Sequence, residues 1–139
     1  TLADDTGLEV DALNGAPGVY SARYAGEKCS YEDNNRKMLT ELKNVPAEKR
    51  TAVFRCVIAV YHPETGSVRT VEGRVQGRII AELRGENGFG YDPIFFLPSM
   101  NKTLAELTIE EKNKVSHRAL ALEKAREIIA ELAGQVSVK

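Results

Sequence analysis

Three short segments of this 139-residue chain combine side-chain types that could act on one ligand. Residues 3–7 (Ala-Asp-Asp-Thr-Gly) contain two adjacent carboxylates. Residues 88–93 (Gly-Phe-Gly-Tyr-Asp-Pro) form an aromatic segment with glycine hinges, and Lys112 with residues 116–118 (Ser-His-Arg) supplies basic donors. Carboxylates suit a divalent metal, aromatic rings suit a base, and basic groups suit phosphates. Together they indicate a metal-bound nucleoside polyphosphate as the ligand.

The two carboxylates, Asp4 and Asp5, come at the end of a predicted apolar strand and before a glycine. Adjacent residues of a strand point to opposite faces, so only one of the two can face a cleft. A carboxylate at the end of a strand can hold Mg²⁺ and orient a water molecule. A solvated turn completed by Gly7 is the alternative, because Asp and Gly are common in turns.

The aromatic segment has a glycine on each side of Phe89, which frees the backbone for close approach to a ligand. Phe89 or Tyr91 could stack on a base, a contact worth roughly 1–3 kcal/mol in nucleic-acid complexes. Asp92 precedes a proline and is therefore held in an extended conformation. The alternative is a hairpin loop whose aromatic rings only cover the core.

The basic groups Lys112, His117 and Arg118 surround the start of the last predicted helix, with Ser116 beside them. Helix N-termini offer free N–H groups to anions. Cations at this end oppose the helix dipole at a cost of about 0.3–1 kcal/mol each. A bound phosphate or a carbonyl-bearing base would offset this cost. The alternative is a solvated basic patch with a capping serine.

Composition and missing motifs exclude several classes of protein. The 19 Lys and Arg residues nearly balance the 20 Asp and Glu residues, so the chain lacks the field that grips nucleic acid or an anionic membrane. It also lacks an apolar membrane span, a signal segment, a phosphate loop, a dinucleotide-binding fingerprint and a nucleophile elbow. Cys29 and Cys56 have no paired spacing and indicate free thiols in the cytoplasm.

The elements predicted around these groups form one α/β domain with a long central hairpin and a terminal helix on the sheet. The hairpin combines residues 51–61, apolar on both faces and so expected inside a covered sheet, with residues 67–72. Gly73 and Gly77 are possible bulges in a further strand. The other predicted elements are a strand over residues 94–97 and helices over residues 30–44, from residue 108 and over residues 116–133, the last ended by Gly134.

Four segments together resemble the inosine triphosphate pyrophosphatase family, also called HAM1-like or non-standard purine NTP pyrophosphatases. They are residues 2–8 (LADDTGL), 15–24 (GAPGVYSARY), 89–93 (FGYDP) and 116–118 (SHR). The resemblance covers essentially the whole chain in order. It implies an α/β fold with an elongated mixed β-sheet and flanking helices, a cleft between two lobes, and a homodimer.

The resemblance also implies Mg²⁺-dependent hydrolysis of ITP, dITP and XTP to the monophosphate and pyrophosphate. Asp5 is then the metal-binding carboxylate and general base. The substrate-binding residues implied are Thr6, Phe89, Gly90, Tyr91, Asp92, Lys112, His117 and Arg118. Hypoxanthine and xanthine carry a 6-oxo acceptor where adenine carries an amino donor, and a pocket of donors would discriminate between them.

The chain departs from the family at its start. Members begin with a strand and a Thr-Gly-Asn loop that carries a lysine, followed by a helix with a metal-binding glutamate, and these have no counterpart here. We therefore expect residues 1–139 to be a single, N-terminally truncated domain of this type. Loss of the phosphate loop would remove several kcal/mol of transition-state stabilisation. The alternatives are a catalytically impaired module for purine-nucleotide binding or dimerisation, and a purely structural domain.

Overall fold

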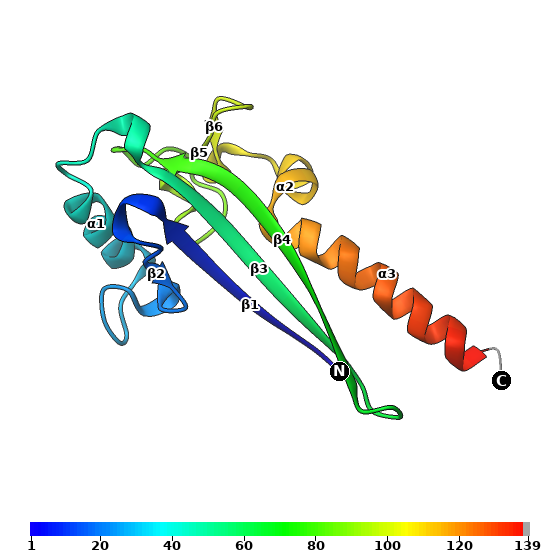
Figure 1. The fold of residues 1–139 in the computed structure, drawn as a ribbon. Helices are drawn as coiled ribbons and strands as arrows, with labels where there is room; N and C mark the ends of the chain where they lie inside the picture. Colours follow the sequence, from blue (N-terminus) through cyan, green and yellow to red (C-terminus); the bar gives the residue numbers. More distant parts are fainter. Residues whose placement is uncertain (138–139) are drawn as a thin grey trace.

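The computed structural model describes residues 1–137, which form a six-stranded sheet with three α-helices (Figure 1). The sheet has the order β2-β1-β3-β4-β5-β6. Its strands are β1 (Leu2–Val10), β2 (Pro17–Gly18), β3 (Thr51–His62), β4 (Ser67–Ile79), β5 (Phe95–Leu97) and β6 (Lys102–Thr103). The helices are α1 (Tyr31–Glu41), α2 (Ile109–Val115) and α3 (His117–Ser137).

The predicted α/β fold with an elongated sheet, a long central hairpin and a terminal helix is confirmed. All five strand pairings within residues 1–137 are antiparallel. The expected sheet is mixed, whereas the described part of the sheet contains no parallel pair. The two strands expected after residue 66 are one continuous strand, β4, which pairs with β3 from Ser67 to Arg78. No helix within residues 1–137 has the length and apolar character needed to cross a membrane.

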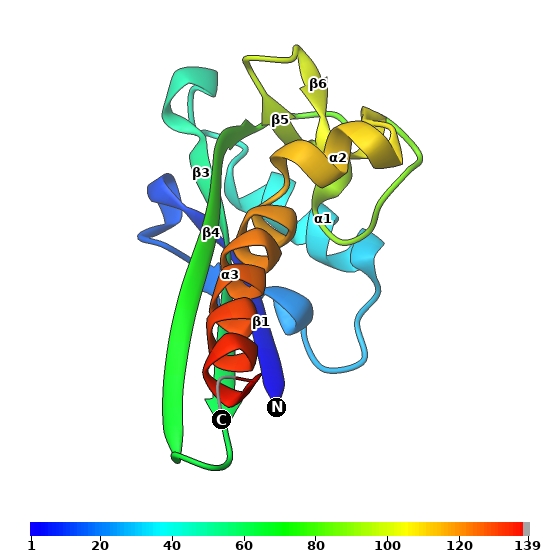
Figure 2. The same ribbon diagram turned by 90° about the vertical axis from the view of Figure 1, so that its right-hand side faces the viewer.

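Gly73 and Gly77 are not bulges, because β4 keeps an unbroken register with β3 through both positions. They permit close packing instead. A Cβ atom on Gly73 would lie 2.0 Å from the backbone oxygen of His117 and 2.5 Å from the backbone nitrogen of Ala121. The first turn of α3 therefore rests directly on the backbone of β4, and Figure 2 shows α3 running alongside β3 and β4.

Only one face of β3 is fully covered by residues 1–137, although both faces are apolar. The residues at even positions, from Ala52 to Val60, are buried, whereas Val57 and Ala59 on the other face remain partly exposed. The prediction that β3 is covered on both faces is therefore wrong for the described part of the chain. The reason is that α3 packs on one side of the hairpin, as Figure 2 shows.

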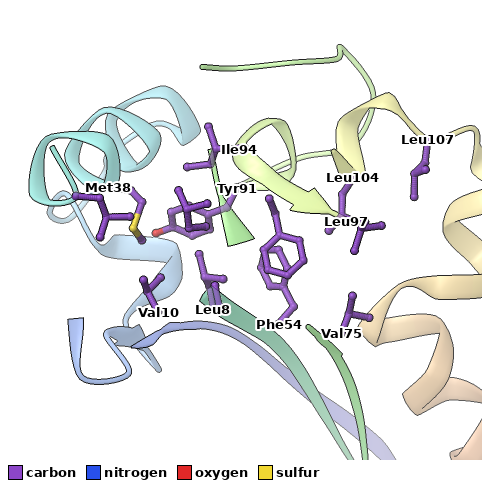
Figure 3. Packing of buried hydrophobic residues seen from close by; sticks show 14 residues of the cluster. Leu8, Val10, Met38, Phe54, Val75, Tyr91, Ile94, Leu97, Leu104 and Leu107 are labelled. Atoms are coloured by element: carbon purple, nitrogen blue, oxygen red, sulfur yellow. The ribbon is translucent and has the colours of Figure 1, made fainter. Parts of the chain in front are cut away.

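Two apolar clusters hold the elements together. The larger one joins the ends of β1 and β3 to α1 and β5, and its rings and aliphatic side chains meet around Leu8, Phe54 and Tyr91 (Figure 3). The smaller one packs Cys56, Ile58 and Val60 of β3 against Ala121, Ala125 and Ile128 of α3. The first cluster fixes the aromatic segment, and the second fixes the start of α3.

Helices α1 and α2 begin where the sequence predicts. The Ser30 hydroxyl accepts a bond from the backbone of Asp33, whose carboxylate accepts one in return, and Thr108 and Glu111 form the same reciprocal cap. Helix α3 continues to Ser137, so the expected end at Gly134 is wrong. A glycine inside a helix lowers helix stability by only about 1 kcal/mol relative to alanine. The packing of α3 on β3 outweighs this cost.

Candidate functional site

The aromatic segment and the basic groups meet at two adjoining pockets beside β1. The apolar pocket, of about 210 Å³, includes Tyr31, Phe54, Phe89 and Tyr91 in its wall. The basic pocket, of about 200 Å³, includes Lys112, Ser116, His117 and Arg118. Four residues line both pockets: Thr6, Phe89, Asp92 and His117. Each pocket alone is smaller than the roughly 300–1,000 Å³ of small-molecule sites, but the two together reach that range.

The two aromatic rings of the predicted base site have different environments. Tyr91 is 5% exposed, and its hydroxyl donates to the backbone oxygen of Ser21 at 2.6 Å. Burial raises the pKa of Tyr91. Phe89 is 52% exposed and stands at the mouth of the apolar pocket. Gly88 and Gly90 on either side have φ values of 82° and 61°, which favour glycine. Tyr91 therefore anchors the segment, and Phe89 is available to a ligand.

Asp92 is a buried anchor and not an open ligand-binding carboxylate. Its Oδ2 atom accepts bonds from Lys112 Nζ at 2.6 Å and from the Phe89 backbone N–H at 3.0 Å. The Asp92 side chain is 5% exposed and that of Lys112 22% exposed. The pair links the aromatic segment to α2. Lys112 Nζ also lies 4.8 Å from the centroid of the Phe89 ring, a cation–π contact.

His117 differs from the other two basic residues at the start of α3, because it is buried and its pKa is lowered. Burial, followed by the nearby charges of Arg118 and Lys112, lowers the pKa of His117 from 6.5 to about 4. Its ring stacks on Phe54 with centroids 4.7 Å apart. The buried Nδ1 atom has no hydrogen-bond partner among residues 1–137. A buried polar atom without a partner is costly, so this nitrogen lacks the hydrogen bond that its burial calls for.

The two adjacent carboxylates lie within β1, which continues to Val10, and not at the end of a strand as expected. They are divided between the two faces of β1, as the strand geometry predicts. Asp4 lies on the α3 face, where its Oδ2 atom accepts a bond from Arg118 at 2.6 Å. Asp5 lies on the opposite face, opposite Val57 in the register, and is exposed. Within the described chain, the Asp5 carboxylate forms no hydrogen bond or ion pair.

Asp5 borders a third pocket, the edge pocket, of about 280 Å³, whose wall includes Thr6, Gly7, Glu9 and Arg55. Arg55 Nη1 lies 3.0 Å from Glu9, and Arg55 also pairs with Glu72. The Arg55 guanidinium is thus paired with the carboxylates of Glu9 and Glu72. Among residues 1–137, Asp5 is therefore the carboxylate of the edge pocket that has no basic partner.

Thr6 connects the three pockets, because it lines each of them. Its Oγ1 atom is buried and has no hydrogen-bond partner in the part of the chain that is described. Along its outer side, β1 pairs with a strand of the described chain only at Leu8 and Glu9. Among the described residues, the part of β1 from Leu2 to Thr6 therefore has no strand paired along this side. Thr6 lies between the two pockets around His117 and the edge pocket that Asp5 borders.

Sequence reasoning missed several residues of the site. Phe54 stacks on the ring of His117. Asn34 and Asn35 of α1 are almost fully buried. The Nδ2 atom of Asn35 donates to the backbone oxygen of Gly90 at 3.1 Å, so α1 helps to hold the aromatic segment. The signal in the sequence was the presence of two adjacent asparagines, Asn34 and Asn35, among the inward-facing residues of the predicted helix. Tyr31 was also missed, because it belongs to no recognised motif.

The described residues fit a Mg²⁺ site in which the protein supplies one carboxylate and the substrate phosphates supply further ligands. No group of three or more His, Cys, Asp or Glu residues within residues 1–137 could hold a metal ion. Mg²⁺ commonly binds through one or two carboxylates together with substrate phosphates. The exposed carboxylate of Asp5, with no partner in the described chain, fits this mode of binding, with Asp5 as the protein ligand.

Comparisons with known proteins identify the family of the chain. The Ham1 family matches residues 1–128. The chain is 57% identical over 131 residues to a dITP/XTP pyrophosphatase of Desulforamulus reducens, covering 94% of this chain and 65% of that protein. It is 56% identical over 128 residues to a dITP/XTP pyrophosphatase of Bacillus subtilis, covering 92% of this chain and 64% of that protein.

Among solved structures, the Ham1 protein of Staphylococcus aureus superimposes with a TM-score of 0.88 at 47% identity. The match covers 94% of this chain and 66% of that one. A HAM1 protein from Coxiella burnetii gives the same TM-score at 46% identity and the same coverage of both chains. The chain thus spans a little under two thirds of the length of the curated relatives named above. By its sequence and its fold, the chain belongs to the Ham1 family.

Proposed function

We propose that residues 1–139 form a single domain that carries the base pocket and a catalytic carboxylate of a nucleoside triphosphate pyrophosphatase. The substrates are non-standard purine nucleotides, ITP, dITP and XTP, and the products are the monophosphate and pyrophosphate. The observation that carries this proposal is that Thr6 lines both pockets around His117 and also the edge pocket that Asp5 borders. The names of the relatives, dITP/XTP pyrophosphatase, support the same reaction.

The base lies in the joined apolar and basic pockets in this proposal. Lys112 and Arg118 carry N–H donors and no acceptor, and each has donors left beyond its carboxylate partner. They suit the 6-oxo group of hypoxanthine or xanthine and offer nothing to the 6-amino group of adenine. The free Nδ1 of His117 and Oγ1 of Thr6 supply two further polar contacts. Phe89, with Gly90, Tyr91 and Asp92 behind it, provides the apolar surface for the ring.

The chemistry takes place at Asp5. The carboxylate accepts a proton from a water molecule, whose oxygen forms a bond to the α-phosphorus. The bond from that phosphorus to the oxygen that bridges to the β-phosphorus breaks, and pyrophosphate leaves with that oxygen. General-base assistance of this kind contributes about 10²–10⁴ to the rate. Mg²⁺, with Asp5 as a ligand, would supply charge stabilisation at the phosphates.

The proposal also includes a homodimer in the cytoplasm. The partly exposed face of the β3–β4 hairpin, with Tyr61 41% and Val68 60% exposed, supports association of two copies. Two free cysteines, Cys29 and Cys56, fit a reducing compartment. Sedimentation velocity would give twice the mass of one chain, and a species of single mass at micromolar concentration would contradict the dimer.

Pyrophosphate release by this chain tests the proposed function. We expect Mg²⁺-dependent release from ITP, dITP and XTP, with kcat/KM at least 100-fold above that for dATP, since an unpaired polar contact costs several kcal/mol. Release from dATP at an equal rate would contradict the base assignment. Tight binding of IMP without turnover of ITP would favour the catalytically impaired module over the enzyme.

A further inference from the structure

Tyr31 stands opposite Phe89 at the mouth of the apolar pocket. Both residues line this pocket, and their ring centroids lie 6.4 Å apart with a 42° angle between the planes. Tyr31 is 58% exposed and Phe89 is 52% exposed. This distance is within the 4.5–7 Å range of aromatic pairs in contact, and both rings keep apolar surface exposed to solvent beside the pocket.

The backbone around Tyr31 is held firmly in place. Tyr31 is the first residue of α1, directly after the capping Ser30. The buried Asn34 donates to the backbone oxygen of Ala22 at 3.1 Å and accepts from the backbone nitrogen of Ala25 at 2.8 Å. Asn35 bonds to the backbone oxygen of Gly90. The same helix turn that carries Tyr31 is thus tied to the loop that carries Phe89.

Phe89 separates the apolar pocket from the basic pocket, because it lines both. Tyr31 lines the apolar pocket, and Lys112, which contacts the Phe89 ring, lines the basic one. The backbone of this segment is held, because the Phe89 N–H donates to Asp92 and the Gly90 oxygen accepts from Asn35, so the exposed Phe89 side chain is the part that can adjust. A flat ring inserted between two parallel aromatic planes needs about 7–8 Å between them, from carbon contacts of 3.5–4.0 Å on each side. A movement of Phe89 by about 1 Å with a rotation toward parallel would provide this space.

We propose that Tyr31 and Phe89 form an aromatic clamp that holds the purine ring between them, so that Tyr31 is a base-binding residue of this chain. This inference rests on the proposed function and deepens it. Tyr31 supplies the second stacking surface, on the side away from Lys112. The polar edge of the purine then faces Thr6 and His117, which line the same pocket. The clamp adds affinity for the flat purine system, and the polar groups select its substituents.

Binding of IMP, measured by titration calorimetry, tests the clamp without turnover. Stacking on one aromatic ring is worth roughly 1–3 kcal/mol, so Tyr31→Ala is expected to raise the Kd of IMP about 10-fold. Tyr31→Phe keeps the ring and is expected to stay within about 2-fold of the unaltered chain. Tyr20→Ala is the matched control, because Tyr20 is 59% exposed and does not line this pocket.

A double-variant cycle distinguishes stacking from a general effect on the fold. If both rings hold the same base, Tyr31→Ala has a smaller effect in a Phe89→Ala background than in the unaltered chain. Equal effects in both backgrounds, an unchanged Kd for Tyr31→Ala, or a loss in Tyr31→Phe equal to that in Tyr31→Ala would each overturn the clamp alone. Absence of IMP binding to the unaltered chain would overturn the clamp and the proposed function together.

Discussion

The two faces of β1 differ in whether their carboxylate is paired with a basic side chain. On the α3 face, Asp4 is paired with Arg118, and the neighbouring Asp92 is paired with Lys112. On the other face, Asp5 has no partner within residues 1–137, although it is adjacent to Asp4 in the chain. The paired charges position the aromatic segment and the start of α3. The proposed function assigns metal binding and proton acceptance to this unpaired carboxylate.

This division explains how one short motif can serve two purposes. A strand sends successive side chains to opposite faces, so Asp4 and Asp5 must act in different surroundings. The residue between the two surroundings is Thr6, which lines the pockets on both sides. In the proposed function, base recognition and chemistry therefore lie on opposite faces of β1.

Replacement of Asp5 is expected to have the largest effect. Asp5→Asn removes the proton acceptor and a metal ligand, so kcat for ITP should fall by about 10²–10⁴-fold. Asp4→Asn is the matched variant on the other face and should change kcat by less than about 10-fold, because Asp4 only pairs with Arg118. Pyrophosphate release under saturating ITP measures both. Similar losses in the two variants would break the distinction between the faces.

The buried pair on the α3 face should matter most for stability. Lys112→Met leaves Asp92, whose side chain is 5% exposed, without its partner, and should lower the free energy of unfolding by about 3 kcal/mol. Lys102→Met is the control, because its pair with Glu111 is exposed and is worth about 1 kcal/mol or less. Urea unfolding measures both free energies. An effect of Lys112→Met no greater than that of the control would contradict an anchoring role for Asp92.

The neutral state of His117 predicts a pH dependence of stability. Its pKa is about 4 in the folded chain against 6.5 ordinarily, so the unfolded chain binds more protons between these values. Stability is therefore full above about pH 6.5 and is lost as the pH falls toward 4, by about 2 kcal/mol between pH 7 and pH 5.

Replacement of each histidine in turn isolates this effect. His117→Gln should flatten the free energy of unfolding between pH 7 and pH 5. His62→Gln, which changes a partly exposed histidine at the far end of β3, should leave the slope in place. Urea titrations at the two pH values give the comparison. The same slope in the unaltered chain and in His117→Gln would show that His117 is not the group that titrates.

The smallest effect is expected for the exposed ion pair of Asp4. The side chains of Asp4 and Arg118 are 40% and 51% exposed, so Asp4→Ala should lower the free energy of unfolding by about 1 kcal/mol or less. Thermal unfolding at low and high salt measures this contribution, which salt should reduce further. A loss well above 1 kcal/mol would mean that Asp4 has an anchoring role like that of Asp92.

Local patterns predicted the parts of the fold that depend on neighbours in the chain. The caps at Ser30 and Thr108 depend on residues three positions away, and both form as expected. The β3–β4 hairpin follows from apolar strands on either side of a turn. The family motifs also identified the segments that meet at the two pockets, including Phe89 and His117.

Contacts between distant segments could not be predicted in the same way. The neutral state of His117 depends on Phe54 and on burial, neither of which is local to it. The tight packing at Gly73 depends on the path of α3. Strand geometry showed that Asp4 and Asp5 must separate, but only the position of α3 determines which of them meets Arg118.

A crystal structure of this chain with Mg²⁺ and a non-hydrolysable analogue of dITP tests most directly whether one nucleotide spans both faces of β1. We expect the base in the pockets beside His117 and the polyphosphate passing over Thr6, with its α-phosphate next to Asp5. Phosphates bound on the α3 face between Lys112 and Arg118, with Asp5 left facing solvent, would contradict it.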